Sequence, residues 1–156
     1  MPAHRVPNLY LDTSVVGGYF DKAFKDDTRE LWRQMEKGLF RFYVSAITVD
    51  EVLTAPLEVR ELAADTFTDP LLQVTPEADR LFQAYMKSKV IPSKFADDAA
   101  HVAVAVVHRM DFVVSWNFKH LANVYRNDAF NAVNLLQGYP PVRIVNPREL
   151  IYGQKL

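Results

Sequence analysis

The chain has 156 residues, of which 49% are apolar and 24% are charged, a composition ordinary for one globular domain. It contains no cysteine, which excludes a disulfide framework, a zinc–thiolate site and a thiol nucleophile. The formal net charge of -1 argues mildly against an electropositive nucleic-acid binder, although it says nothing about local patches.

The same features predict a cytoplasmic protein that does not cross a membrane. No apolar run approaches the roughly 20 residues that span a bilayer. The stretch Met1–Arg5 lacks the apolar core of a signal peptide, and the absence of cysteine suits a reducing compartment. Because no repeat, low-complexity tract or linker interrupts the sequence, we expect residues 1–156 to form a single domain.

The stretch Asn8–Asp12 predicts a strand that is apolar and ends in an acid. Two hydroxyl residues, Thr13 and Ser14, follow it and precede the start of a helix or a tight turn. In a parallel sheet, ligands collect at the carboxyl ends of the strands, so Asp12 is a candidate for chemistry. Aspartate is also a common helix N-cap, and this alternative stays open.

Helical and strand patterns alternate along the next part of the chain. They predict a helix that begins at Asp26 and ends at Gly38, a strand at Phe40–Val44, and a short helix with N-cap candidates at Ser45–Thr48. They also predict a helix at Leu57–Phe67 after Pro56, a short strand at Leu71–Val74, and a helix that starts at Thr75–Glu77.

The second half continues this alternation. Ser93 can cap a helix at Lys94–Arg109, whose centre is so small and apolar that we expect burial on more than one side. A strand at Phe112–Ser115, a patchy helical region that Asn117 can begin, and a strand at Pro141–Val145 follow. Alternating strands and helices predict an α/β fold in which helices flank a mainly parallel sheet, whose strand order stays open.

Several acids are placed to meet at one edge of this sheet. Strand ends and the starts of the following helices share that edge, so we expect Asp12, Glu51 and Asn117 to converge. Asp98 joins them only if its helix has its N-terminus there. Asp111 opens the fourth strand and should lie at the opposite edge, roughly 13 Å away.

Two neighbouring acids complicate this choice. Asp50 and Asp97 adjoin Glu51 and Asp98, and each projects about 100° round the helix from its neighbour. The pattern alone does not decide between Asp50 and Glu51.

Four short motifs occur in order, at Leu11–Ser14, Ser45–Val52, Asp98–Ala103 and Val113–Asn117. Together they resemble the PIN-domain nucleases, in particular the small VapC-type toxins of prokaryotic toxin–antitoxin pairs. The resemblance covers almost the whole chain, including Val145–Leu150, and selects Glu51 and Asp98 as site acids. It implies a three-layer PIN-like fold, ribonuclease activity, an RNA substrate, a cognate antitoxin protein and a homodimer.

One position departs from the family pattern. Many members carry an acid in the fourth motif, where this chain has Asn117. An amide is a neutral and weaker metal ligand, so a second metal ion is in question. Asn117 can bind a water, a metal or a phosphate oxygen, or it can cap its helix.

Three carboxylates without cysteine suit Mg²⁺ or Mn²⁺, which prefer oxygen ligands. Close carboxylates also repel one another unless a cation neutralises them. We expect Asp12 and Asp98 to be direct ligands and Glu51 to bind through water or to orient the attacking water. The metal would promote ionisation of that water and offset charge developing on a phosphodiester.

Nearby side chains have competing interpretations. Ser14 can donate to Asp12 or to phosphate, or it can serve the helix cap, and Lys119 and His120 can contact a phosphate backbone or form a solvated helix start. His101 shares a helix face with Asp98, and we favour a packed histidine there. Trp116 is expected to pack rather than to stack on bases.

Rival functions fit less well. A haloacid-dehalogenase-like phosphatase needs a second acid where this chain has Ser14, and the glycine patterns of dinucleotide and P-loop sites are absent. A catalytically degenerate PIN fold that binds protein or RNA is the remaining alternative, and Asn117 supports it.

Overall fold

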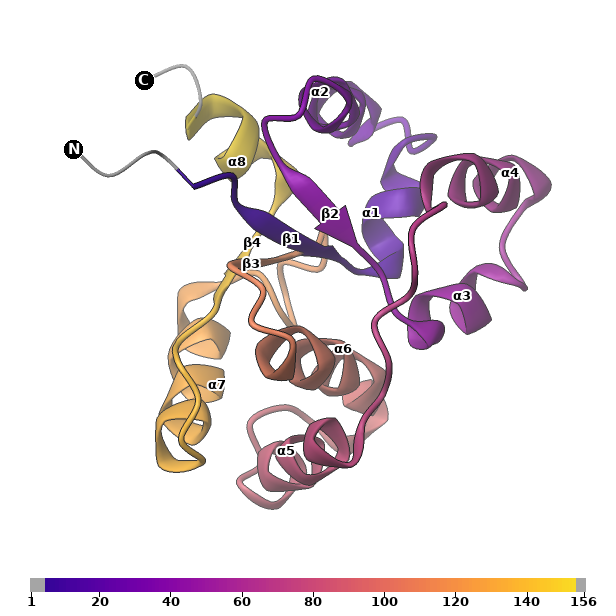
Figure 1. Cartoon of the computed structure of the whole chain (residues 1–156). Coiled ribbons are helices and arrows are strands. Elements are labelled where there is room, and N and C mark those ends of the chain that lie inside the picture. Colours follow the sequence, from indigo (N-terminus) through magenta and orange to yellow (C-terminus); the bar gives the residue numbers. More distant parts are fainter. Residues whose placement is uncertain (1–4, 154–156) are drawn as a thin grey trace.

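The computed structural model describes residues 5–153 and has a four-stranded sheet at its centre (Figure 1). The strands are β1 (Asn8–Leu11), β2 (Arg41–Tyr43), β3 (Phe112–Val114) and β4 (Arg143–Val145). Their order is β2-β1-β3-β4, and each neighbouring pair is parallel. The predicted parallel α/β architecture is confirmed.

Helices cover both faces of this sheet and create three layers (Figure 1). One face carries α5 (Pro76–Lys87), α6 (Ala96–Val107) and α7 (Val124–Leu136). The other carries α1 (Thr13–Gly18), α2 (Lys25–Glu36) and α8 (Pro147–Gly153), with α3 (Ala46–Val52) and α4 (Leu57–Thr66) following β2. None of the helices described in residues 5–153 is both long and apolar enough to cross a membrane.

Alternating side chains of the strands build the two halves of the core. Tyr10 and Val113 pack with α5, α6 and α7, whereas Leu9, Leu11 and Val114 pack against the opposite layer. Side chains of successive strand residues point to opposite faces, and a parallel sheet covered on both faces needs apolar residues on each. This requirement explains why β1 reads as a continuous apolar run.

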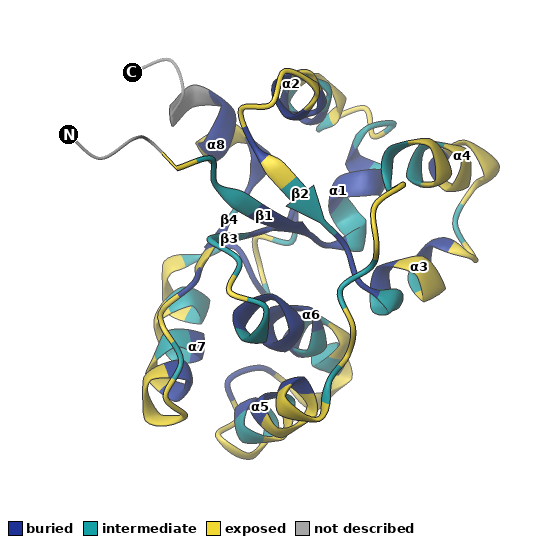
Figure 2. Ribbon diagram, viewed as in Figure 1, coloured by how far each residue is buried: buried dark blue, intermediate teal, exposed yellow. Residues whose placement is uncertain are grey.

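Helix α6 is buried along most of its length, as expected from its small apolar side chains (Figure 2). It lies between the sheet and α5. The predicted cap was wrong, because Ser93–Phe95 forms a separate 3₁₀ turn and α6 begins at Ala96 without a side-chain cap. Its first turn carries Asp97 and Asp98.

Two further sequence predictions were wrong. Leu71–Val74 does not form a strand, because only Leu72 makes a bridge, to Ser45, and Pro70 and Pro76 flank the segment without N–H donors. Asn117 does not begin a helix. It opens a turn in which its carbonyl accepts from Leu121 and Ala122, and α7 begins after the N-cap Asn123.

The two glycines that end α1 provide a matched test of this packing. A Cβ on Gly18 would lie 2.6 Å from Trp116 Cδ1 and Nε1, whereas a Cβ on Gly17 would meet nothing within 4 Å. We expect Gly18→Ala to lower the free energy of unfolding by about 1–3 kcal/mol through overpacking. Gly17→Ala should raise it by up to about 1 kcal/mol through helix propensity. Urea denaturation measures both, and equal effects would contradict this packing.

Candidate active site

Asp12 occupies the carboxyl end of the central strand β1 and is only 3% exposed. Its Oδ1 accepts hydrogen bonds from the Ser14 backbone N–H at 2.9 Å and from Ser14 Oγ at 2.5 Å. The side chain is thus the N-cap of α1, as one interpretation predicted. The cap uses Oδ1, so it is compatible with a further role for Asp12.

Glu51 projects from α3 toward this edge of the sheet. Its Oε1 accepts from Thr13 Oγ1 at 3.1 Å and is hydrogen-bonded to His101 Nε2. Asp50, at the preceding position of the helix, is exposed. The structure therefore answers the question that the pattern left open: Glu51, not Asp50, faces the site.

Asp98 lies in the first turn of α6, whose N-terminus is at the same edge as Asp12. Asp98 therefore joins the site, as expected for a helix whose N-terminus lies at this edge. Asn117, in the turn after β3, donates from Nδ2 to Asp98 Oδ2 at 3.1 Å and accepts from the His120 N–H at Oδ1. The exposed Asp97 makes no such contact in the described residues.

The three carboxyl groups affect one another electrostatically. Burial, and then the charge of Asp12, raise the pKa of Asp98 to about 6, and Glu51 adds to this effect. Burial also raises the pKa of Asp12, against the opposing effects of His101 and Ser14. The hydrogen bond from His101 lowers the pKa of Glu51. The site thus concentrates negative charge that it compensates only in part.

A divalent cation fits this donor set by its chemistry, since mutually repelling carboxylate oxygens are the preferred ligands of Mg²⁺ and Mn²⁺. The side chains are not arranged as a ready-made cage. Among residues 5–153, no three His, Asp or Glu side chains are grouped so that they could hold one ion. Each carboxyl group is hydrogen-bonded to a neighbouring side chain instead: Asp12 to Ser14, Glu51 to His101 and Asp98 to Asn117. Cation binding at these oxygens therefore requires side-chain rotation, and Asp98 is only half-buried.

The other predicted residues take different positions. Ser14 Oγ donates to Asp12 and accepts from the Trp116 N–H at 2.9 Å, so it joins the ends of β1 and β3. Lys119 is exposed in the turn that Asn117 opens. Trp116 packs as predicted: it is buried, and its ring stacks on Phe24 with 4.2 Å between centroids.

Sequence reasoning missed the hydroxyl groups that surround the carboxylates. Thr13 binds Glu51, and Ser115 Oγ accepts from the Asn117 N–H at 3.0 Å while lying 3.4 Å from Ser14 Oγ. Ser45, which caps α3, follows β2 as Ser115 follows β3. A hydroxyl residue within two positions of the end of each of three strands was the signal that could have identified them.

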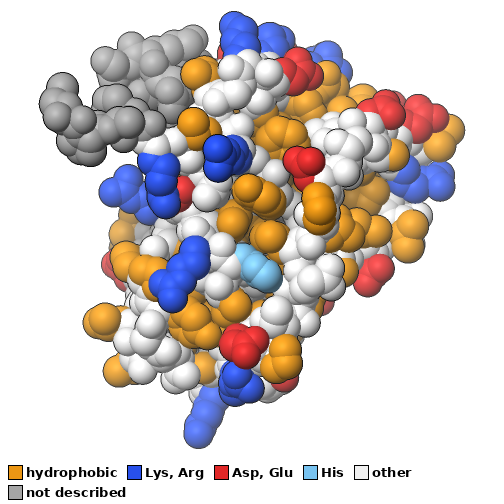
Figure 3. Space-filling model, viewed as in Figure 1, with side chains coloured by type: hydrophobic (Ala, Val, Ile, Leu, Met, Phe, Trp, Pro, Cys, Tyr) orange, Lys and Arg blue, Asp and Glu red, His pale blue; other side chains and the backbone are white. Residues whose placement is uncertain are grey.

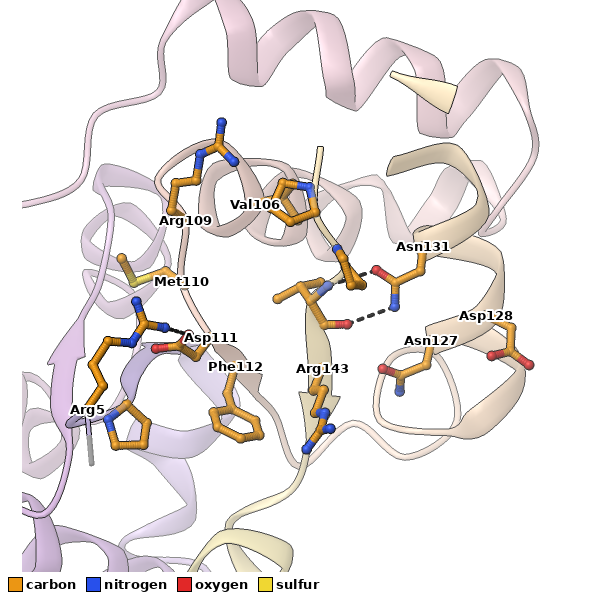
Figure 4. A pocket seen from close by; sticks show the side chains of 14 residues that line it. Arg5, Val106, Arg109, Met110, Asp111, Phe112, Asn127, Asp128, Asn131 and Arg143 are labelled. Atoms are coloured by element: carbon orange, nitrogen blue, oxygen red, sulfur yellow. Dashed lines mark hydrogen bonds and ion pairs between the residues drawn. The ribbon is translucent and has the colours of Figure 1, made fainter. Parts of the chain in front are cut away.

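A cavity of about 770 Å³ lies at the opposite edge of the sheet (Figure 4). It contains Asp111, which pairs with Arg5 and accepts from the Asn8 N–H at 2.7 Å, as well as Arg109 and Arg143. The predicted placement of Asp111 away from the site is confirmed. Asp111 already pairs with Arg5, and Arg109 and Arg143 line the cavity together with Asp128, so this cavity does not rival the carboxylate edge as a cation site.

The order of the strands and the helices on both faces define a PIN-like α/β fold. A chain from the crystal structure of FitAcB from Neisseria gonorrhoeae shares this fold with a TM-score of 0.57. The match covers 89% of the present chain and 97% of that chain at 17% sequence identity. No protein-family model matches the sequence, and no curated protein matches it either.

The raised pKa of Asp98 predicts a pH-dependent stability of the metal-free protein. The pKa of Asp98 rises from 3.8 to about 6 on folding. Asp98 therefore makes its full contribution to the free energy of unfolding below about pH 4 and loses it as the pH rises through about 6. We expect Asp98→Asn to raise the free energy of unfolding by about 1–2 kcal/mol near pH 8, a range that allows for partial solvent screening, and to have little effect near pH 4.

Urea denaturation at the two pH values measures this difference. The matched control is Asp97→Asn, which removes a charge from the exposed neighbouring position. A gain for Asp98→Asn that is equal at both pH values would contradict the role of ionisation.

Proposed function

We propose that the chain is a metal-dependent ribonuclease that hydrolyses phosphodiester bonds and serves as the toxin of a toxin–antitoxin pair. The observation that carries this proposal is the meeting of Asp12, Glu51 and Asp98 at one edge of the sheet, where burial and Asp12 raise the pKa of Asp98. The resemblance of the four sequence motifs to VapC-type toxins and the PIN-like fold support it.

In this proposal Asp12 and Asp98 are the direct ligands of Mg²⁺ or Mn²⁺, each through a carboxylate oxygen that side-chain rotation makes available. Oδ1 of Asp12 is bound by Ser14, and Oδ2 of Asp98 by Asn117. When bound, the cation supplies Lewis acidity that promotes ionisation of a water and offsets charge on the phosphodiester.

The chain's own residues orient the reactants. Glu51 is fixed through one carboxylate oxygen and can accept a hydrogen bond from the attacking water with the other. Exposed Lys119 can contact a phosphate of the RNA. Ser14 keeps the ends of β1 and β3 together through its bonds to Asp12 and to the Trp116 N–H. Asn117 is a neutral donor to Asp98, which favours a single cation over two.

A surface beside the site suits a protein partner, as the proposed antitoxin requires. Val49 of α3, Leu53 directly after α3 and Leu57 of α4 are large apolar side chains that are 40%, 66% and 60% exposed. They lie at a groove of about 250 Å³ or close to it, and Figure 3 shows apolar side chains gathered over these helices. The resemblance also makes a homodimer part of the proposal, and the absence of cysteine makes a cytoplasmic location part of it.

A degenerate PIN-like protein that only binds protein or RNA is the second candidate. Asn117 favours it, because its amide pairs with Asp98 where many relatives of the motif carry an acid. The two candidates differ in cation binding and in turnover.

Cleavage of a mixed RNA pool with Mg²⁺ tests the proposed activity. We expect Asp12→Asn and Asp98→Asn each to lower the cleavage rate about 100-fold or more, because each removes a charged ligand. Both variants should also bind Mn²⁺ more weakly in calorimetry.

The matched control is Asp111→Asn, an acid at the opposite edge that pairs with Arg5 and should leave cleavage within about twofold of the wild type. If the wild type and Asp98→Asn cleave equally, the activity comes from a contaminant. If the intact protein does not bind Mg²⁺ or Mn²⁺, the nuclease proposal is wrong and the binding module is favoured.

A further inference from the structure

His101 lies in a buried chain of hydrogen bonds that the proposed reaction does not use. Its side chain is 2% exposed, its Nε2 is bonded to Glu51 Oε1, and its Nδ1 is bonded to the Tyr10 hydroxyl. Tyr10 is completely buried and lies 2.7 Å from Ser45 Oγ. The packed histidine that the sequence predicted is therefore also a hydrogen-bonded one.

The hydrogen atoms of this chain can be assigned in a single direction. Ser45 Oγ accepts from the Ile47 N–H at 3.2 Å, so its own hydrogen is available to the Tyr10 oxygen. The Tyr10 hydrogen then points to Nδ1 of His101, which leaves Nε2 as the N–H that donates to Glu51. Each hydrogen has an acceptor when the imidazole is neutral.

This series of hydrogen bonds also joins the three elements that carry the site acids. Tyr10 precedes Asp12 by two residues on β1, and His101 follows Asp98 by one turn on α6. Glu51 itself belongs to α3. One buried side chain thus fixes the spacing of β1, α3 and α6 at the site.

Glu51 receives both of its donors on one oxygen. Thr13 Oγ1 at 3.1 Å and His101 Nε2 both bond to Oε1, and no described residue donates to Oε2. We propose that His101 is a positioning residue that holds Glu51 by Oε1 and turns Oε2 toward the cation or the attacking water. This inference rests on the proposed nuclease function, because it assigns the oxygen of Glu51 that takes part.

Two amide variants of His101 separate positioning from packing. The amide nitrogen of glutamine reaches about the place of imidazole Nε2, and that of asparagine reaches about the place of Nδ1. His101→Gln therefore keeps a donor to Glu51, whereas His101→Asn keeps only a contact to Tyr10. Both lose the ring, so a loss that comes from packing alone affects both.

We expect His101→Asn to lower kcat for RNA cleavage and the affinity for Mn²⁺ alone by about 10–100-fold, the range typical of groups that orient metal ligands. KM for RNA should change less than about twofold, because His101 does not reach the surface. His101→Gln should recover kcat and Mn²⁺ affinity to within about threefold of the wild type. Equal losses in the two variants would overturn the proposal.

Nitrogen NMR of the wild-type protein supplies a readout that does not depend on activity or on folding of a variant. With labelled histidine, we expect Nε2 of His101 to carry a proton that is hydrogen-bonded to Glu51. A proton on Nδ1 with a bare Nε2 would overturn the proposal, because Nε2 then donates nothing to Glu51. Absence of RNA cleavage by the wild type would instead refute the nuclease function, whatever the tautomer.

Discussion

The burial of one carboxyl group, that of Asp12 at the end of β1, constrains the rest of the site. A carboxylate that leaves water loses several kcal/mol unless hydrogen bonds or a cation replace its hydration. The Ser14 N–H and hydroxyl replace part of it. Because β1 lies between β2 and β3, the segments that follow those two strands end beside Asp12. They bring Glu51 from one side and Asn117 from the other.

The site acids differ in how firmly they are held. Glu51 has two donors on a single oxygen, and its pKa lies below the usual range because His101 is hydrogen-bonded to it. Asp98 has one amide donor, and its pKa lies above the usual range because it is partly buried near Asp12. One acid is thus fixed and charged, while the other is held by a single amide donor and has a pKa of about 6. This division suits a site that assembles around a cation.

Local pattern was sufficient where one segment decides the outcome. The apolar run into Asp12 predicted a buried strand and an acid at its end, and both are observed. The local pattern failed at Leu71–Val74. A strand there needs a neighbouring strand to pair with, and the segment makes only the single bridge between Leu72 and Ser45. Contacts between distant segments could not be predicted, because the path of the chain decides them. The bond between Glu51 and His101, 50 residues apart, and the approach of Asp98 to Asp12 are of this kind.

Anomalous X-ray scattering from a crystal soaked with Mn²⁺ tests most directly whether the three acids form a cation site. We predict one strong peak at the carboxyl edge of the sheet, about 2.0–2.4 Å from an oxygen of Asp12 and an oxygen of Asp98. Glu51 should lie within reach of the ion directly or through one water. A crystal without ordered Mn²⁺ at this edge, or with Mn²⁺ bound beside Asp111 at the opposite edge, would contradict the site.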